Sequence, residues 1–246
     1  MPDLADDGEL VEHIKRLEKT YTDRIFHQLY ANAGNLLAWY NEPNQVRDAW
    51  LGKLATSPKA QSMTWNQVGE IVIVGLLHRC FPDWYPIGLP IGSETRLSSD
   101  DAIIHVDVKT HKEKDTDLDR AQGVRPEQIS GDGTDSKIQD LKGELGDSAP
   151  KLPPFYVFGN ILKVCLSLFV ICVYKFDPEE YYQYLNRVQL FTVPNGLIRA
   201  TKDYRDIWRA GKDRHRIRVN LPALAAHESW RWREFVYEPH GVVITH

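Results

Sequence analysis

A long apolar run in the second half of the chain constrains the fold more than any other feature. Residues 162–176, LKVCLSLFVICVYKF, are rich in β-branched and aromatic side chains and show no regular polar alternation. Such a run is typical of a central strand that is covered on both faces. Its most apolar part, residues 164–174, is too short to cross a bilayer as a helix. The run therefore predicts a sheet with further layers packed against it.

A second strand is predicted at residues 102–110, where the pattern has a period of two. Val106 and Val108 alternate with polar residues, so Asp107 and Lys109 project side by side from the opposite face. We interpret this segment as a half-buried strand with one polar face.

An acidic residue upstream of this strand completes a candidate hydrolytic site. Glu94 lies thirteen positions before Asp107. Phosphodiester hydrolysis uses a hard divalent cation near the scissile phosphate, and such a cation takes carboxylate and carbonyl oxygens as ligands. Lys109 could orient or deprotonate the attacking water, or stabilise charge on phosphorus. The residues alone leave a second interpretation open, in which Asp107 and Lys109 are a solvated pair on an edge strand.

Helical periodicity dominates the first third of the chain. Residues 8–40 predict one or two amphipathic helices, which pack on the core or offer a face to a second subunit. Residues 64–81 predict another helix, with Thr64 as its N-cap. Glu70 lies on this helix among apolar neighbours, and either faces water or stands behind the metal site. Helices and strands together predict an α/β fold with a mixed central sheet flanked by helices.

The remaining segments differ in charge. Residues 111–150 form a polar tract with six Lys or Arg against ten Asp or Glu, which predicts either disorder or a functional loop over a site. Residues 183–199 predict a strand that ends in the turn V-P-N-G-L. Residues 199–218 hold eight Lys or Arg against three Asp, in a chain whose net charge is −4. The chain as a whole is therefore not a nonspecific polyanion binder, and basic charge is concentrated locally.

Several classes of protein are excluded by missing motifs. The sequence has no Gly-x-Gly-x-x-Gly, no phosphate-binding loop and no Gly-x-Ser-x-Gly elbow, and its nine histidines lack metal-ligand spacing. Its three cysteines are an odd number without zinc-site spacing, which predicts reduced thiols. The acidic N-terminus lacks an apolar core, so we expect no signal peptide and a cytoplasmic location.

Nine short blocks, in register over about residues 65–221, resemble a known family. They are V-G-E (68–70), I-G-L-P-I-G-S-E (87–94), V-D-V-K (106–109), D-T-D-L-D (115–119), Q-I-S-G-D-G (128–133), L-P-P-F-Y (152–156), V-P-N-G-L (193–197), A-G-K-D (210–213) and R-I-R-V (216–219). The family is the BglI-like group of type II restriction endonucleases, which also includes SfiI, within the PD-(D/E)XK nuclease superfamily. The resemblance implies the restriction-endonuclease-like fold of that superfamily.

The resemblance also implies roles for individual residues. Glu94 stands where the family has its first metal-binding aspartate, Asp107 is the second acid, and Lys109 is the catalytic lysine. The carbonyl of Val108 would be a further metal ligand, and Glu70 matches a glutamate whose helix borders the site. Glu94 departs from the family by one methylene, which leaves Asp101 as a rival first ligand, but the I-G-L-P-x-G frame fixes the alignment at Glu94 and favours it.

Family members act as homodimers that cut interrupted palindromes with G·C half-sites in the presence of Mg²⁺, and two-fold protein symmetry mirrors the site. The segment that includes Lys212, Asp213, Arg216 and Arg218 corresponds to the family's major-groove segment. Arginine and lysine can pair with guanine, and an aspartate can accept from cytosine N4. The alternative is a basic surface that contacts phosphates only. The spacer within this segment is shorter than in the family.

We therefore predict a single nuclease domain over residues 1–246. It comprises a helical N-terminal region (1–63), a catalytic and DNA-recognition core (64–221) and a C-terminal segment (222–246). The predicted function is Mg²⁺-dependent, site-specific cleavage of double-stranded DNA by a homodimer, with a DNA methyltransferase as its functional partner. The alternatives are a structure-specific repair or junction nuclease of the same fold, and a DNA-binding protein without catalysis.

Overall fold

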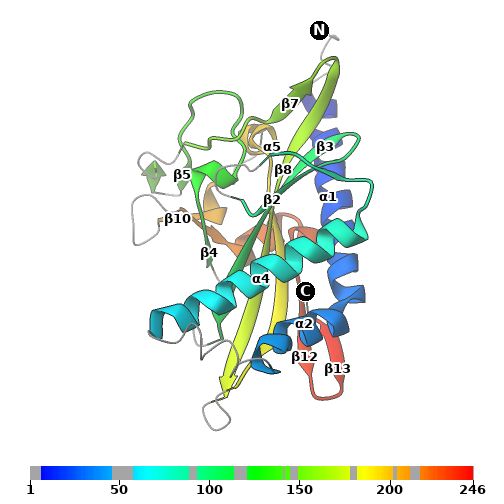
Figure 1. Ribbon diagram of the computed structural model, residues 1–246. Coiled ribbons are helices and arrows are strands. Elements are labelled where there is room, and N and C mark those ends of the chain that lie inside the picture. Colours follow the sequence, from blue (N-terminus) through cyan, green and yellow to red (C-terminus); the bar gives the residue numbers. More distant parts are fainter. Residues whose placement is uncertain are drawn as a thin grey trace.

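The computed structural model describes residues 7–45, 58–88, 93–113, 121–140, 142–144, 149–177, 182–201, 204–210 and 217–245. In this part of the chain, helices lie across one face of a large twisted sheet, and a smaller sheet lies against its other side (Figure 1).

The large sheet has eight strands within the described residues, in the order β1-β2-β3-β8-β9-β12-β13, with β7 also paired to β8. Only β3 and β8 are parallel, so the sheet is mixed, and the predicted α/β fold is confirmed. The strands are β1 (Tyr85–Pro86), β2 (Thr95–Ser98), β3 (Ala102–Lys112), β7 (Phe155–Phe158), β8 (Ile161–Asp177), β9 (Tyr182–Val193), β12 (Trp232–Glu238) and β13 (Gly241–Ile244).

Strand β8 is the centre of this sheet, as its apolar run predicts. Every residue from Val164 to Tyr174 is buried, and the strand pairs with β3 on one edge and β9 on the other. Strand β3 differs from its prediction. Its residues from Ala102 to Val108 are all buried, so it is covered on both faces and not on one alone.

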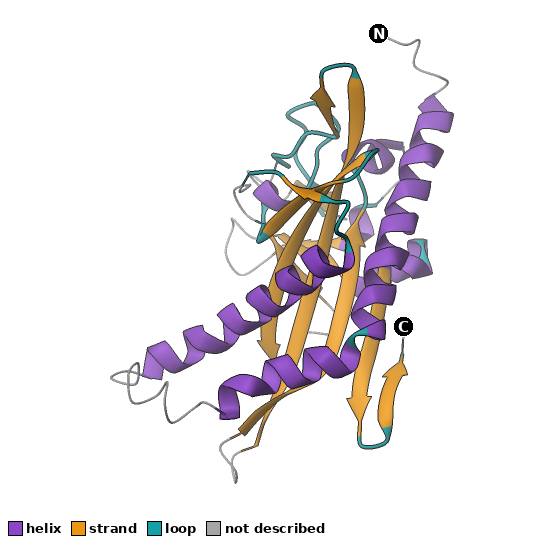
Figure 2. Cartoon of the chain, turned by 45° about the vertical axis from the view of Figure 1, so that its right-hand side comes forward, coloured by secondary structure: helices purple, strands orange, loops and turns teal. Residues whose placement is uncertain are grey.

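Three helices cover one face of the large sheet: α1 (Asp7–Ala31), α2 (Ala33–Gln45) and α4 (Pro58–Cys80) (Figure 2). The prediction of one or two helices over residues 8–40 is confirmed, since α1 and α2 lie there. Helix α4 begins six residues before Thr64, so the prediction that Thr64 is the N-cap is wrong. A proline is well tolerated in the first turn of a helix, where its missing N–H has no partner to lose.

A buried ion pair joins the N-terminal and C-terminal regions. Glu18 on α1 contacts Arg231 at 2.7 Å, and both side chains are fully buried. Glu228 contacts the same guanidinium at 2.7 Å, and burial is the largest influence on Glu18, whose pKa it raises. Residues of α1, β8 and β12 share one hydrophobic core. The division into 1–63, 64–221 and 222–246 remains a prediction.

The polar tract after β3 contains ordered structure. Its described residues include β4 (Ala121–Val124), the 3₁₀ helix η1 (Pro126–Gln128), β5 (Gln139–Asp140) and β6 (Gly143–Glu144). Strand β4 pairs with β11 (Ile217–Asn220), which pairs with β10 (Trp208–Ala210). We call these three strands the small sheet. The described residues 121–140 are therefore not a disordered loop, because cross-strand pairing with a distant segment orders them.

The chain after β9 also departs from prediction. The predicted strand 183–199 ends at Val193, and α5 (Gly196–Thr201) follows at once. Asn195 explains the change, because its Oδ1 accepts from the amide of Leu197 at 3.0 Å and caps the helix. The last elements are η2 (Arg205–Ile207), α6 (Leu221–His227) and η3 (Ser229–Arg231).

The three cysteines are free, as predicted, and two of them are buried. No helix in the described part of the chain combines the length and the apolar character that a bilayer crossing needs.

A glycine lets α4 approach β3 closely next to Glu70. A Cβ on Gly69 would lie 2.5 Å from Oγ1 of Thr110, whereas a Cβ on Gly75 of the same helix would meet nothing within 4 Å. Gly75→Ala should stabilise the protein by about 0.5–1 kcal/mol, the usual gain in a helix. Gly69→Ala should be less stable than Gly75→Ala by about 1–3 kcal/mol, since the added methyl overpacks the contact. Urea denaturation of both variants tests this, and equal stability would contradict the close approach.

Candidate active site

The antiparallel pairing of β2 with β3 brings Glu94 next to Asp107. Thr95 lies opposite Val106, and the amide of Glu94 donates to the carbonyl of Val106 at 3.2 Å. The Glu94 side chain turns back along β3, where its Oε2 accepts from the amide of Val108 at 2.6 Å. Glu94 and Asp107, hereafter the acidic pair, are thus held at one end of the β2–β3 hairpin.

Asp101 lies at the other end of the same hairpin. It follows the turn after β2, is exposed, and accepts from the hydroxyl of Tyr21 at 2.5 Å. Six residues of extended strand separate it from Asp107, a distance of about 20 Å. The structure therefore brings Glu94, and not Asp101, to Asp107.

Asp107 is 4% exposed, and its two oxygens meet different partners. Oδ2 pairs with the ammonium of Lys109, which also lies 5.6 Å from the centre of the Phe169 ring. Oδ1 accepts from the side-chain amide of Gln128 at 2.5 Å. The shared face predicted for Asp107 and Lys109 is present, but it is largely covered.

Burial disfavours the state in which both carboxyls of the acidic pair are ionised. The pKa of Glu94 is raised to about 7, mainly by burial and next by the charge of Asp107, while the hydrogen bond from the amide of Val108 opposes the shift. Burial likewise raises the pKa of Asp107, against the opposing influence of Lys109. Like charges in a low-dielectric site disfavour full ionisation, and a cation placed between them would reverse that effect.

Glu70 lies near this pair from the helix side. Burial is the largest cause of its raised pKa, and the charge of Asp107 is the next. The carboxyl is partly buried. The role of Glu70 behind the acidic pair remains a prediction.

Gln128 is a site residue that the pattern analysis missed. It lies on η1 and is 5% exposed, and its Oε1 accepts from the amide of Arg125 at 2.8 Å. Periodicity gave no signal for it, because it lies within a tract that has no regular pattern. The block Q-I-S-G-D-G in the resemblance begins at this residue and could have pointed to it.

The residues present fit a hard divalent cation. Two carboxylates suit Mg²⁺, which commonly keeps several waters and adds substrate phosphate oxygens. The carbonyl of Val108 points to the same edge of β3 as its amide, towards Glu94, because the two groups of one strand residue face the same neighbour. Within the described residues no group of three or more His, Cys, Asp or Glu side chains is close enough to hold a metal. The fit therefore rests on the acidic pair and a backbone oxygen.

Of the four predicted DNA-contacting residues, Arg218 lies within the described part of the chain. It stands on β11 of the small sheet, opposite Gly123 on β4 and Arg209 on β10. Ile217 and Val219 beside it are buried, so the predicted alternation of this strand is confirmed where it is described. Lys212, Asp213 and Arg216 lie outside the described residues.

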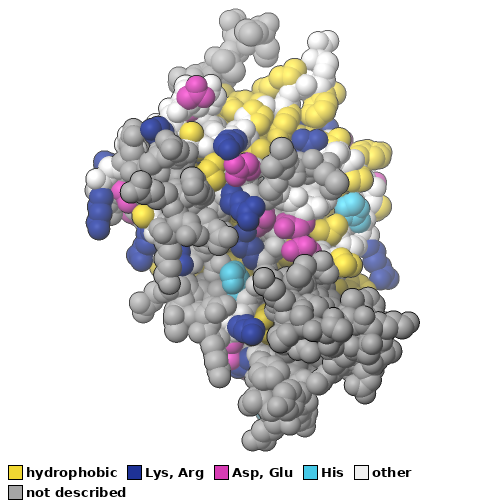
Figure 3. Space-filling model, turned by 60° about the vertical axis from the view of Figure 1, so that its left-hand side comes forward, with side chains coloured by type: hydrophobic (Ala, Val, Ile, Leu, Met, Phe, Trp, Pro, Cys, Tyr) yellow, Lys and Arg dark blue, Asp and Glu magenta, His cyan; other side chains and the backbone are white. Residues whose placement is uncertain are grey.

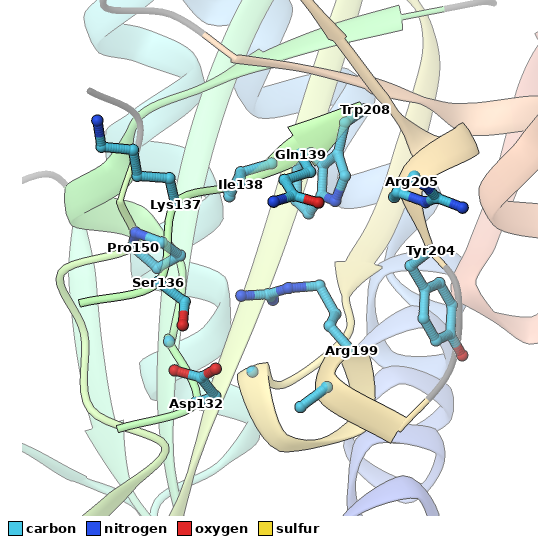
Figure 4. A pocket seen from close by; sticks show the side chains of 13 residues that line it. Asp132, Ser136, Lys137, Ile138, Gln139, Pro150, Arg199, Tyr204, Arg205 and Trp208 are labelled. Atoms are coloured by element: carbon cyan, nitrogen blue, oxygen red, sulfur yellow. The ribbon is translucent and has the colours of Figure 1, made fainter. Parts of the chain in front are cut away.

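A cavity of about 340 Å³ lies beside the small sheet, between α5 and residues 131–139 (Figure 4). Its lining does not include the acidic pair. The guanidinium of Arg199 donates to the carbonyls of Pro194 and Ser130 and packs against the ring of Trp208. These contacts tie α5 to neighbouring segments, so we assign Arg199 a structural role.

The side of the molecule that carries β4, β5 and β10 shows acidic and basic side chains close together near its centre (Figure 3). The mixed sheet thus gathers two carboxylates and a lysine at the open end of the β2–β3 hairpin.

Comparison with known families identifies the class of this protein. Residues 9–178 match the model described as type II restriction enzyme MwoI, N-terminal domain. The chain belongs to this family of type II restriction enzymes, and it is a type II site-specific deoxyribonuclease. Comparison with curated proteins gave no significant match.

Two solved structures share the fold. Restriction endonuclease BglI, bound to its DNA recognition sequence, is 23% identical with a TM-score of 0.70, over 95% of this chain and 98% of that one. Tetrameric restriction endonuclease SfiI, bound to cognate DNA, is 16% identical with a TM-score of 0.67, over 99% and 95%. The predicted resemblance is confirmed.

The raised pKa of Glu94 predicts a measurable effect on stability. The folded state holds the proton up to pH of about 7, whereas an ordinary glutamate loses it near 4.5, so ionisation of this group destabilises the fold as pH rises through that window. Glu94→Gln should therefore melt a few degrees higher than wild type at pH 8 without divalent metal, and the difference should shrink at pH 5.

Added Mg²⁺ should raise the melting temperature of wild type at pH 8 and leave Glu94→Gln nearly unchanged, because a ligand stabilises only the state that binds it. Differential scanning fluorimetry in EDTA and in Mg²⁺ measures both effects. Equal melting temperatures of the two proteins at pH 8 in EDTA would contradict this, since they would show that ionisation of Glu94 costs no stability.

Proposed function

We propose that this restriction enzyme depends on Mg²⁺, held by the carboxylates of Glu94 and Asp107 and the carbonyl of Val108. The observation that carries the proposal is the hydrogen bond from the amide of Val108 to Glu94. That bond supports a site in which the acidic pair and Lys109 surround one point at the edge of β3.

The bound ion would neutralise charge on the scissile phosphate and on the attacking oxygen. Lys109 orients or deprotonates the attacking water, or stabilises the charge on phosphorus. Its ammonium is held beside Asp107 and over the Phe169 ring, which limits its freedom. Glu70 borders the site from α4 and adds negative charge there. These roles make Glu70, Glu94, Asp107 and Lys109 the proposed catalytic set.

The proposed substrate is double-stranded DNA with an interrupted, G·C-rich palindrome, cut by a homodimer in the cytoplasm. Arg218 supports this, because β11 presents it on the small sheet while the neighbouring residues are buried. Lys212, Asp213 and Arg216, just before β11, complete the proposed base-reading segment. An enzyme of this kind requires a DNA methyltransferase that protects the same sites in its host.

A plasmid digest separates this function from its alternatives. Wild type with Mg²⁺ should give discrete bands from unmethylated plasmid. Asp107→Ala and Lys109→Ala should each reduce cleavage by several orders of magnitude, and Lys109→Ala should keep specific DNA binding. Asp101→Asn is the matched control, since Asp101 lies at the far end of the hairpin, and it should cleave normally.

Three outcomes would contradict the assignment. Normal cleavage by Asp107→Ala or Lys109→Ala removes that residue from the catalytic set, and loss of activity in Asp101→Asn moves the first ligand. Nicking that follows DNA structure and not sequence would favour the repair or junction nuclease.

Arg218 allows a test of base reading. If it pairs with a guanine in the major groove, Arg218→Ala should cost about 1–3 kcal/mol and relax preference at one base pair. A phosphate contact would instead weaken binding to all sequences alike and lower the salt slope by about one. Competition binding against every single-base variant of the mapped site measures the difference, and uniform loss would remove Arg218 from the base-reading set.

A further inference from the structure

The side-chain amide of Gln128 is fixed at both ends. Its Oε1 accepts from the amide of Arg125 at 2.8 Å, and its Nε2 donates to Oδ1 of Asp107 at 2.5 Å. Because a backbone N–H can only donate, the first contact determines that the NH₂ end faces Asp107. The side chain is 5% exposed, so water is largely excluded from these contacts.

This contact orients the carboxylate of Asp107. With Oδ1 held by Gln128, the second oxygen is turned to the side of Lys109. Oδ2 is buried and pairs with the ammonium of Lys109, so the two oxygens of Asp107 have separate partners. An N–H donor to Oδ1 also favours the charged form of the carboxylate, the form a cation needs.

The other end of Gln128 is attached to the small sheet. Arg125 directly follows Val124, the last residue of β4, and Val124 pairs with Ile217 on β11. The amide of Gln128 donates to the carbonyl of Arg125 at 3.0 Å and closes the 3₁₀ turn between them. A short, hydrogen-bonded segment therefore joins the strand that carries Arg218 to the carboxylate of Asp107.

We propose that Gln128 is a positioning residue that couples DNA binding at β11 to the orientation of Asp107. Because β4 is hydrogen-bonded to β11, a displacement of β11 on the DNA also displaces Arg125. The hydrogen bonds of Gln128 then transmit this displacement to Oδ1 of Asp107. The inference rests on the proposed function of the acidic pair and Arg218, and adds how the two are linked.

The segment supplies a matched control. Glu127 precedes Gln128 on the same 3₁₀ turn, but its carboxylate pairs with Lys151 at 2.5 Å and not with Asp107. Glu127→Gln removes that surface ion pair and leaves both contacts of Gln128 in place. Gln128→Leu keeps the approximate volume and removes both. Gln128→Met keeps the length of the side chain and removes the donor to Asp107 without adding a charge, so it remains informative if the leucine variant is unstable.

The first readout is binding at equilibrium, without turnover. Affinity for the cognate duplex, made with a non-hydrolysable linkage at the mapped scissile position, is measured in EDTA and in Mg²⁺. Coupling is reciprocal, so if DNA binding prepares Asp107 for the ion, Mg²⁺ must tighten cognate binding by the same factor, typically about 5–150-fold. In both Gln128 variants, Mg²⁺ should change the affinity for cognate DNA by no more than about two-fold. Their affinity in EDTA should stay within about two-fold of wild type. Glu127→Gln should retain the wild-type Mg²⁺ factor.

The second readout compares single-turnover cleavage of the cognate site with that of a site changed at one base pair. Both Gln128 variants should slow cognate cleavage by about ten-fold or more and slow the altered site far less, so that discrimination falls. Equal slowing at both sites would show that Gln128 acts on Asp107 alone and would overturn the coupling. An unchanged Mg²⁺ factor in the Gln128 variants would also overturn it.

Failure of the proposed function gives a different result. If wild type does not cleave in Mg²⁺, the catalytic assignment fails. If wild type cleaves and Mg²⁺ tightens cognate binding equally in wild type and both Gln128 variants, only the coupling fails. A variant that melts near wild type but has lost binding in EDTA assigns Gln128 a structural role in the small sheet, and this too overturns the proposal.

Discussion

The parallel pairing of β3 with β8 is the constraint on which the rest of the structure depends. It runs over eleven residue pairs from Ala102 to Lys112 and places β3 between β2 and β8, whose residues from Val164 to Tyr174 are all buried. Every side chain from Ala102 to Val108 is therefore shielded from water, whichever face it occupies. A carboxylate at position 107 has lost its solvent, so its charge must be stabilised by neighbouring groups. Lys109 and Gln128 supply that stabilisation from two sides.

The acidic pair lowers the stability of the fold locally. Two carboxyls with raised pKa values lie together, and neither Lys109 nor the amide of Val108 fully offsets their burial. Replacement of one by a neutral residue removes the repulsion, which is why a more stable protein and a less active one are expected from the same substitution. Elsewhere in the core, Glu18 and Arg231 show the contrasting case, where buried charges of opposite sign meet directly at 2.7 Å.

Sequence periodicity predicted those features that depend on one element at a time. The apolar run defined β8, helical spacing defined α1 and α2, and period-two alternation placed Asp107 and Lys109 on one face. It failed where a distant segment decides the environment. His105 shows this, since period-two alternation puts it on the same polar face as Asp107 and Lys109. Its ring bonds the hydroxyl of Tyr156 at 2.9 Å, and burial lowers its pKa to about 3, so it is neutral and buried.

The same limit explains why the tract after β3 was misjudged. Strand β4 is only four residues long and has no strong pattern of its own, and it is ordered by pairing with β11 nearly a hundred positions later. A contact of this kind depends on the register of two separate strands, which local composition does not encode. Resemblance reached further, since its blocks included Gln128 and fixed Glu94 in preference to Asp101. The resemblance rests on the matching order of short blocks along the chain and not on the chemistry of single residues.

The register of β2 and β3 explains why a side chain longer by one methylene fits at position 94. Glu94 precedes β2 and has no strand partner beyond its amide bond to Val106, so its side chain must reach along β3 to meet the site. The longer arm reaches the amide of Val108, from which Oε2 accepts at 2.6 Å, and this bond fixes the carboxylate. In the proposed metal site, the amide of Val108 would therefore hold the carboxylate of Glu94 in place.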